Sequence, residues 1–324
     1  MILVCGEILF DIFKGAAHES GFSLDARIGG SPYNVAAGLA RMGQAAGFLG
    51  GISNDWLGDA LMAALAREGV ATDGVVRPAG PTTVSFVDLQ GDGSARYAFY
   101  GSGAADRNLE VADLPAQIPE NLKAIHLGSY SAVVAPVAAA LDALLARTPD
   151  VFVSYDPNVR PTVEPDLDRW RAWVAHRVEQ ADLVKVSAED LEILYPGQSA
   201  EAVAQAWLAR GPALVVVTDG GAGARAWTAA QSVAVEGRAV QMVDTVGAGD
   251  TFQAALLTGL VEMGLAERGR LDRNGVAGLD AAALRRLLDF ATTAAAHVVA
   301  RRGADLPRRG DLPHLGAPNL EERS

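Results

Sequence analysis

The second half of the chain alternates short apolar runs with stretches of helical periodicity. Apolar runs of strand length occupy residues 124–127, 151–155, 183–186 and 213–218. Helical periodicity marks the segments between them, at residues 134–147, 166–180, 188–194 and 200–209. Strands that alternate with helices favour a mostly parallel sheet that helices cover on both faces. We therefore expect an α/β fold in three layers, an αβα sandwich.

The first hundred residues have a different texture. The pattern predicts strands at 2–4, 8–13 and 46–49, helices at 34–42 and 56–68, and a polar stretch up to about residue 26. The extended stretches Thr82–Leu89 and Ser94–Tyr100 flank Gly91-Asp92-Gly93, which predicts a β-hairpin. This hairpin stands outside the α/β alternation. We expect it to form a small β lid, with lid elements near residues 8–28 and 82–103.

The remainder of the chain adds three short extended segments and two helices. The extended segments are predicted at 224–228, 232–235 and 239–243, and the helices run from Thr251 and over 281–300. The tail beyond Gly303 is rich in Pro, Gly and Arg, and we expect it to lie on the surface. Without an internal repeat, the pattern favours one domain over residues 1–310, followed by a C-terminal tail at 311–324.

Composition excludes several classes of partner. The 324 residues are half hydrophobic, enough for one large core, and carry a formal net charge of −12. That charge argues against nucleic acid and anionic membranes as partners, and no apolar run reaches membrane-spanning length. The single cysteine, Cys5, lies in an apolar run, so we expect a buried thiol in a reducing cytoplasm. The five histidines have no metal-ligand spacing.

The segment Asp244–Asp250 carries the strongest chemical signal. It is a glycine loop between an apolar stretch and a helix start, with a carboxylate at each end. One interpretation is a turn in which Asp250 caps the helix. The segment is not a dinucleotide fingerprint, because the third glycine is missing, and it is not a P-loop, because no Lys-Ser/Thr follows. Backbone N–H groups of Gly247, Ala248 and Gly249 could instead form an anion hole. Asp250 would then serve as a base beside a phosphate.

Two signatures make the chain resemble the ribokinase-like sugar kinases of the phosphofructokinase B type. Asp244–Phe252 resembles the C-terminal signature, and Gly29–Ala36, followed by Gly43, resembles the N-terminal one. The similarity extends from Cys5 to about Gly303, and Gly6–Asp11 makes it greatest to the bacterial fructokinases. The resemblance implies a ribokinase-like fold and transfer of phosphate from ATP to a small sugar.

The resemblance also implies roles for individual residues. Asp250 matches the catalytic base that deprotonates a sugar hydroxyl, and Gly247, Ala248 and Gly249 match the anion hole. The sugar-binding set matches Asp11, Gly29, Gly30 and Asn34. Asn158 and Arg160 belong to a segment that lies near the sugar and the transferring phosphate in the family, where Arg160 could stabilise developing charge. The lid aromatics Tyr97 and Phe99 either stack on the sugar or pack the lid.

The nucleotide and its ions are implied in the same way. The loop Thr218–Gly223 resembles the family's nucleotide loop, and the residues matched to ATP binding are Ser187, Thr218, Gly220, Gly221, Gly223 and Thr292. In the family, an Asn-x-x-Glu motif is linked to Mg²⁺ through water. This chain has Ser187-Ala188-Glu189-Asp190 in that place. Asp190 is therefore the matched acid, and its shorter side chain could change how Mg²⁺ is bound. Asp244 matches an acid that helps to build a monovalent-cation site in several relatives, which makes K⁺ a candidate ion.

The sugar itself is left open. Gly101 stands where related ketodeoxygluconate kinases often carry Arg, which favours a neutral sugar and a fructokinase. Ketodeoxygluconate, ribose and nucleosides are the alternative substrates. A sugar-binding protein without catalysis and a nicotinamide-dependent oxidoreductase are alternatives of another class. Pairing of lids in the family, and the exposed edges of a hairpin, favour a homodimer.

Overall fold

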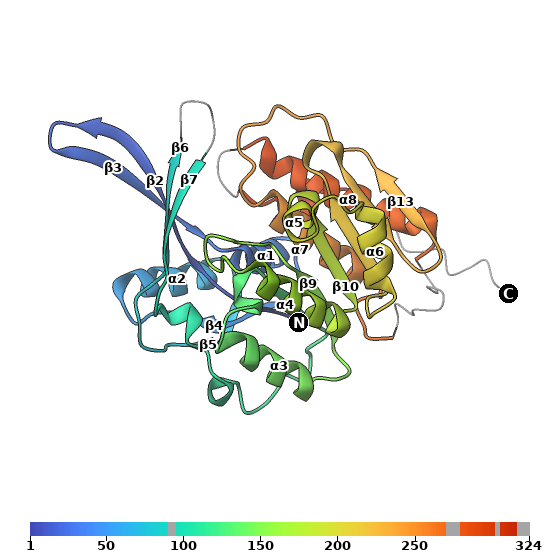
Figure 1. Cartoon of the computed structure of the whole chain (residues 1–324), viewed down its shortest axis with the longest axis horizontal. Coiled ribbons are helices and arrows are strands. Elements are labelled where there is room, and N and C mark those ends of the chain that lie inside the picture. Colours follow the sequence, from blue (N-terminus) through green and yellow to red (C-terminus); the bar gives the residue numbers. More distant parts are fainter. Residues whose placement is uncertain (90–94, 270–278, 302–304, 316–324) are drawn as a thin grey trace.

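The computed structural model describes residues 1–89, 95–269, 279–301 and 305–315. Its centre is a nine-stranded sheet (Figure 1). In spatial order the strands are β13 (Ser232–Val235), β12 (Ala224–Trp227), β11 (Leu214–Thr218), β10 (Leu183–Ser187), β9 (Phe152–Asp156), β8 (Ala124–Gly128), β1 (Ile2–Cys5), β4 (Ala46–Gly51) and β5 (Ala71–Val76). The strands from β11 to β5 are parallel, and β12 and β13 are antiparallel. The predicted mostly parallel sheet is confirmed.

Helices cover both faces of this sheet because its strands are apolar on both sides. In β11, Leu214 and Val216 join one core cluster, whereas Val215 and Val217 join the other. The first cluster is completed by α1 (Ser31–Arg41), α2 (Trp56–Arg67), α7 (Ala248–Glu262) and α8 (Ala281–Val299). The second is completed by α3 (Val137–Arg147), α4 (Leu167–Gln180), α5 (Ala188–Leu194) and α6 (Ala200–Leu208). The result is a three-layer αβα sandwich.

A second sheet of four strands projects from the body as the lid (Figure 1). Its order is β3 (Gly21–Gly29), β2 (Leu9–His18), β6 (Val84–Leu89) and β7 (Ala95–Tyr100). β6 and β7 pair antiparallel, which confirms the predicted hairpin, although its turn at Gly91–Gly93 lies outside the described residues. The lid is therefore built from two hairpin arms that are distant in sequence.

The structure corrects three local predictions. The polar stretch up to residue 26 consists of the end of β2 and the start of β3, which pair antiparallel, and the prediction overlooked the strand alternation of apolar and polar residues from Phe22 to Ile28. The half-buried edge strand β5 was not predicted. The predicted strand at 239–243 is wrong: Met242 and Val243 are exposed, and Val243 N–H bonds the carbonyl of Val299 at the end of α8.

The remaining segments close the core. Cys5 is a buried free thiol, as expected. In the tail, Leu306, Leu312 and Leu315 are buried, the last two against the core cluster that contains α7. Short 3-10 helices lie at Ala105–Arg107, Val111–Asp113, Tyr130–Ala132, Gly220–Ala222 and Arg309–Asp311. Among the described helices, none combines the length and apolarity that a membrane crossing requires.

Candidate active site

Three neighbouring parallel strands end with polar residues at the same edge of the sheet. Asp156, Ser187 and Thr218 are the last residues of β9, β10 and β11, and Ser187 and Thr218 pair in register. Ligands of doubly wound sheets gather outside the carboxyl ends of the strands. The segments predicted to bind nucleotide and sugar therefore converge on one edge.

Helix α7 begins at the glycine loop and directs its positive end toward this edge. Gly247 is its N-cap, with a φ of 79°, the left-handed region that favours glycine. No side chain caps this helix start, although Ala248 donates its N–H to the carbonyl of Thr245. Asp250 lies in the first turn, where the helix dipole favours negative charge. The loop thus presents backbone N–H groups and a carboxylate together.

Two donors from helix α1 hold the Asp250 carboxylate. Ser31 Oγ donates to Oδ1 at 2.6 Å, and Asn34 Nδ2 donates to Oδ2 at 2.8 Å. The helices approach closely because Gly38 has no side chain; a Cβ there would lie 2.8 Å from Ala254 Cβ. The N-terminal and C-terminal signatures therefore meet directly at this carboxylate. The hydroxyl of Ser31 was not predicted to take part.

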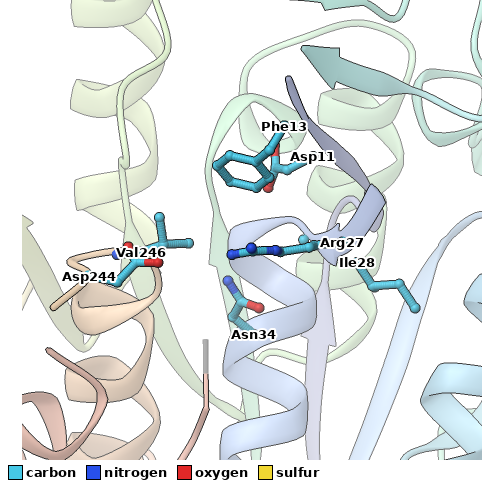
Figure 2. Close-up of a pocket in the computed structure, with 8 residues that line it drawn as sticks. Asp11, Phe13, Arg27, Ile28, Asn34, Asp244 and Val246 are labelled. Atoms are coloured by element: carbon cyan, nitrogen blue, oxygen red, sulfur yellow. Dashed lines mark hydrogen bonds between the residues drawn. The ribbon is translucent and has the colours of Figure 1, made fainter. Parts of the chain in front are cut away.

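A small pocket lies beside Asn34, the residue that donates to the Asp250 carboxylate. Its lining includes Asp11, Phe13 and Arg27 of the lid, Asn34 of α1, and Asp244 of the glycine loop. In Figure 2 the side chain of Arg27 extends across the pocket toward Val246 and Asp244, and the side chain of Asn34 points toward the guanidinium of Arg27. The predicted residues of the sugar set thus come together, whereas Arg27 was missed.

The predicted glycines of this pocket are needed for close approach. A Cβ on Gly29, which also lines the pocket, would lie 2.2 Å from Asp11 Oδ2. Gly30 precedes α1 with a φ of 104°, and its Cβ would lie 2.8 Å from the carbonyl oxygen of Glu7. The two glycines let the chain enter α1 directly beneath the lid.

Burial raises the pKa of Asp11, against the effects of a hydrogen bond from Ser85 and the positive charge of Arg160. Arg160 is exposed and donates from Nη1 to the carbonyl of Val159. Asn158, just before, has a φ of 41°, in the left-handed region. This turn directs the predicted arginine toward the side of the site that holds Asp11.

The residues matched to magnesium binding already have structural partners. Ser187 Oγ caps α5 by accepting the N–H of Asp190 at 3.0 Å. Asp190 Oδ1 accepts the N–H of Val159 at 2.9 Å, so this acid ties α5 to the turn that carries Arg160. Among the described residues, no cluster of three His, Cys, Asp or Glu could hold a metal ion.

A groove of about 530 Å³ follows the nucleotide loop, lined by residues that include Ala222, Gly237 and Arg238. In the loop, Gly220 and Gly223 have φ values of 45° and 107°, which favour glycine, and a Cβ on Gly221 would meet no neighbour within 4 Å. Thr292 on α8 is buried, and its hydroxyl has no hydrogen-bond partner. The groove is of the size that ligand pockets commonly have.

The lid aromatics have different environments. Phe99 packs edge-on against Tyr130, with ring centroids 5.6 Å apart, and the guanidinium of Arg107 lies over its ring. This contact supports packing of the lid as the task of Phe99. Tyr97 pairs through its backbone with Val87, and its side chain lies outside the described residues.

One buried ion pair lies behind the glycine loop and was not predicted as part of the site. Lys185 Nζ of β10 donates to Asp156 Oδ2 of β9 at 2.8 Å, and both side chains are buried. Burial raises the pKa of Asp156 to about 6, which Lys185 opposes. An apolar strand that contains one lysine was the only signal in the sequence that could have revealed this pair.

Comparisons with known proteins agree with this geometry. The model of the pfkB family carbohydrate kinases matches residues 2–309. A fructokinase from Rhizobium leguminosarum bv. trifolii is 37% identical over 288 residues, which cover 88% of this chain and 86% of that protein. A fructokinase from Oryza sativa subsp. japonica is 36% identical over 270 residues, covering 81% and 83%.

Solved structures show the same architecture. The fructokinase of Xylella fastidiosa with bound ATP superposes with a TM-score of 0.84, 30% identity and coverage of 96% of both chains. The fructokinase of Vibrio cholerae O395, bound to fructose, ADP and calcium ion, superposes with a TM-score of 0.75, 28% identity and coverage of 94% of both chains. From these matches and the meeting of its two signatures at one carboxylate, the chain belongs to the pfkB family of carbohydrate kinases.

Proposed function

We propose that this protein is a fructokinase, which transfers the γ-phosphate of ATP to the primary 6-hydroxyl of fructose. The observation that carries the proposal is the Asp250 carboxylate, which lies at the uncapped start of α7 and is held by Ser31 and Asn34. Asn34 joins it to a pocket beneath the lid that Asp11 and Gly29 also line. The fructokinases among the relatives, one of them bound to fructose and ADP, support the choice of sugar.

The reaction requires a base, positioned reactants and stabilisation of charge. Asp250 accepts the proton of the sugar hydroxyl as that oxygen attacks the γ-phosphorus. The backbone of Gly247, Ala248 and Gly249 stabilises the transferred phosphoryl group. Arg160, whose charge acts on Asp11, supplies a further positive charge on the sugar side.

The pocket residues bind the sugar. Asp11 and Asn34 make hydrogen bonds to its hydroxyls, while Gly29 and Gly30 let it lie against the backbone. Asn158 shapes the turn before Arg160, and Tyr97 and Phe99 complete the lid. When fructose enters, Asn34 exchanges its bond to Asp250 for one to the sugar, which leaves a carboxylate oxygen for the reacting hydroxyl.

ATP occupies the groove beside the nucleotide loop, with Thr218, Gly220, Gly221 and Gly223 at its phosphates. Ser187 and Thr292 contribute further contacts; the buried hydroxyl of Thr292, which bonds no other described residue, is left for the nucleotide. Mg²⁺ commonly binds through substrate phosphates, waters and few carboxylates, so a site without an acidic cluster fits it. The ion would neutralise phosphate charge, and Asp190 would contact it through water.

Asp244 is the candidate ligand of K⁺. It lines the pocket, and its Oδ1 accepts the N–H of Val246 at 3.0 Å, so that a cation bound there would act on the glycine loop. Replacement of K⁺ by tetramethylammonium should lower activity. Equal activity in the two salts would refute this role.

The lid also provides the surface for a homodimer. Phe22 and Leu24 of β3 and Tyr100 of β7 expose half or more of their surface, and large exposed apolar groups commonly mark interfaces. Sedimentation analysis of Leu24→Glu beside the unmodified protein tests this assembly. The acidic charge and the single buried thiol fit the cytoplasm, the compartment we propose.

The surroundings of Gly101 are relevant to the alternative substrate, a sugar acid. A Cβ on Gly101 would lie 2.5 Å from Phe99 Cε1 and 3.3 Å from Arg107 Nε, so an arginine at this position would have to displace the Phe99 ring, which favours a neutral sugar. Fructose, ribose and ketodeoxygluconate at matched concentrations should show the highest kcat/KM with fructose. A preference for another sugar would refute the proposed substrate.

The role of Asp250 is tested by Asp250→Asn, which keeps the shape of the side chain and removes the base. We expect kcat to fall roughly a hundred- to ten-thousandfold, while calorimetry still detects fructose binding. Asp168→Asn, at an acid whose side chain is 90% exposed on α4, is the matched control and should retain full kcat. A near-normal kcat in Asp250→Asn would show that another group is the base.

A further inference from the structure

The ion pair of Lys185 and Asp156 lies directly behind the first turn of α7. The ammonium of Lys185 would be 3.2 Å from a Cβ on Gly249, the last glycine of the loop. Lys185 is 4% exposed and Asp156 is 1% exposed. A side chain at position 249 would therefore crowd this ammonium, which places a charge behind the proposed anion hole.

This arrangement is unfavourable for stability alone. Burying two charges removes their hydration, and apolar side chains of similar size often stabilise a fold as well or better. A cation near a helix N-terminus is repelled by the helix dipole. In addition, Asp156 Oδ1 is buried and has no hydrogen-bond partner among the described residues, so the pair leaves this polar atom unsatisfied. A structural pair would be expected to satisfy them.

Lys185 is nevertheless held as a cation by its surroundings. Burial acts to lower the pKa of Lys185, but the negative charges of Asp156, Asp250 and Asp190 outweigh it, and the pKa is raised. Two of these acids, Asp250 and Asp190, remain when Asp156 is neutralised. Their negative charges continue to favour the ammonium form of Lys185 in a variant that lacks the Asp156 carboxylate.

We propose that Lys185 is a positioning residue for phosphoryl transfer, which supports the loop at Gly249 and adds positive potential behind the phosphoryl group. The proposal rests on the proposed kinase function. Negative charge accumulates at the transferred phosphoryl group in the transition state, and a fixed cation in a buried site stabilises it without reorganisation. Lys185 acts through the backbone of the loop and through its field, so it should affect turnover more than substrate binding.

The decisive comparison is Asp156→Asn against the double variant Asp156→Asn with Lys185→Met. Both lack the carboxylate, and they differ only in the ammonium. We expect the double variant to have a kcat roughly tenfold to a hundredfold lower than Asp156→Asn, somewhat less than the loss of a direct oxyanion donor. KM for fructose and for ATP should agree within about threefold. Affinity for MgADP with aluminium fluoride and fructose, which mimics the transition state, should fall with kcat.

A control comes from an ion pair in which the arginine is buried and the acid is partly exposed. Arg177 Nη1 of α4 bonds Asp142 Oδ1 of α3 at 2.5 Å, with no exposure of the arginine side chain, among the helices that cover the opposite face of the sheet. Arg177→Met with Asp142→Asn should lower stability and leave kcat unchanged.

Two outcomes would overturn the proposal. The first is equal kcat and equal affinity for the aluminium fluoride complex in the two Asp156 variants. The second is failure of the double variant alone to fold, because the ammonium would then be needed for the structure. Turnover of fructose by the unmodified protein is measured first. It tests the proposed function independently, so that the two hypotheses can fail separately.

Discussion

Glu7 provides a stringent test of the electrostatics beneath the lid. It lies in the connection between β1 and β2, is 1% exposed, and accepts a hydrogen bond from Ser131 Oγ at 2.5 Å. Burial raises its pKa from 4.5 to about 7, against hydrogen bonds from Ser131 and Ser129, and the nearby Asp106 raises it further. The folded protein therefore binds a proton at Glu7 more tightly than the unfolded chain does.

The sign and size of the effect follow from this difference. A raised pKa gives a contribution to stability that is complete below pH 4.5 and is lost as the pH rises through about 7. Each pH unit between the two pKa values corresponds to about 1.4 kcal/mol. The whole loss is thus about 3 kcal/mol of unfolding free energy for this fully buried group.

Urea unfolding of the unmodified protein and of Glu7→Gln, measured from pH 5 to pH 8.5, tests the reasoning. Glutamine does not titrate, so the unfolding free energy of the variant should rise relative to that of the unmodified protein as the pH rises. Most of this relative increase should occur between pH 5 and 7. Glu68→Gln is the control without a pH-dependent effect: the hydrogen bond from Arg41 lowers the pKa of Glu68 below 4.5, so this group does not titrate above pH 5 and the variant should differ from the unmodified protein by a constant amount. A difference between Glu7→Gln and the unmodified protein that is constant over this range would refute the argument.

Two further predictions concern the pocket and the edge of the sheet. Gly29→Ala would bring a Cβ to 2.2 Å from Asp11 Oδ2, so the Asp11 side chain must rotate away. We expect KM for fructose to rise by roughly tenfold, the effect of one lost hydrogen bond. An unchanged KM would contradict the role of Asp11. Ser187→Ala removes the cap of α5, which should cost about 1 kcal/mol in urea unfolding. Stability equal to that of the unmodified protein would show that the cap contributes nothing.

Local periodicity was sufficient to predict most of the body. The strands around Val153 and Val215 are apolar on both sides because helices cover both faces, and such runs are read directly from the sequence. The lid was harder. Strand β3 has alternating apolar residues from Phe22 to Ile28, but it is mostly exposed and joins no core, and the pairing of its backbone with β2 defines it. In contrast, 239–243 is apolar but has no strand partner.

The residues of the candidate site were likewise predicted only in part. Asp250, Asn34 and the loop glycines were found because two signatures resemble one family. Ser31 and Lys185 were missed, because their importance depends on what lies beside them: an oxygen of Asp250 at 2.6 Å in one case, and Gly249 and Asp156 in the other.

The sequence by itself determined the α/β class, the parallel sheet, the hairpin of the lid and the acid that serves as the proposed base. These properties follow from short stretches, whose periodicity and glycine spacing are local. Only the tertiary structure decided that α1 delivers Ser31 and Asn34 to Asp250 across more than two hundred residues, and that Lys185 lies behind the glycine loop. Such contacts depend on how closely packed helices and neighbouring strands approach, which no single segment specifies.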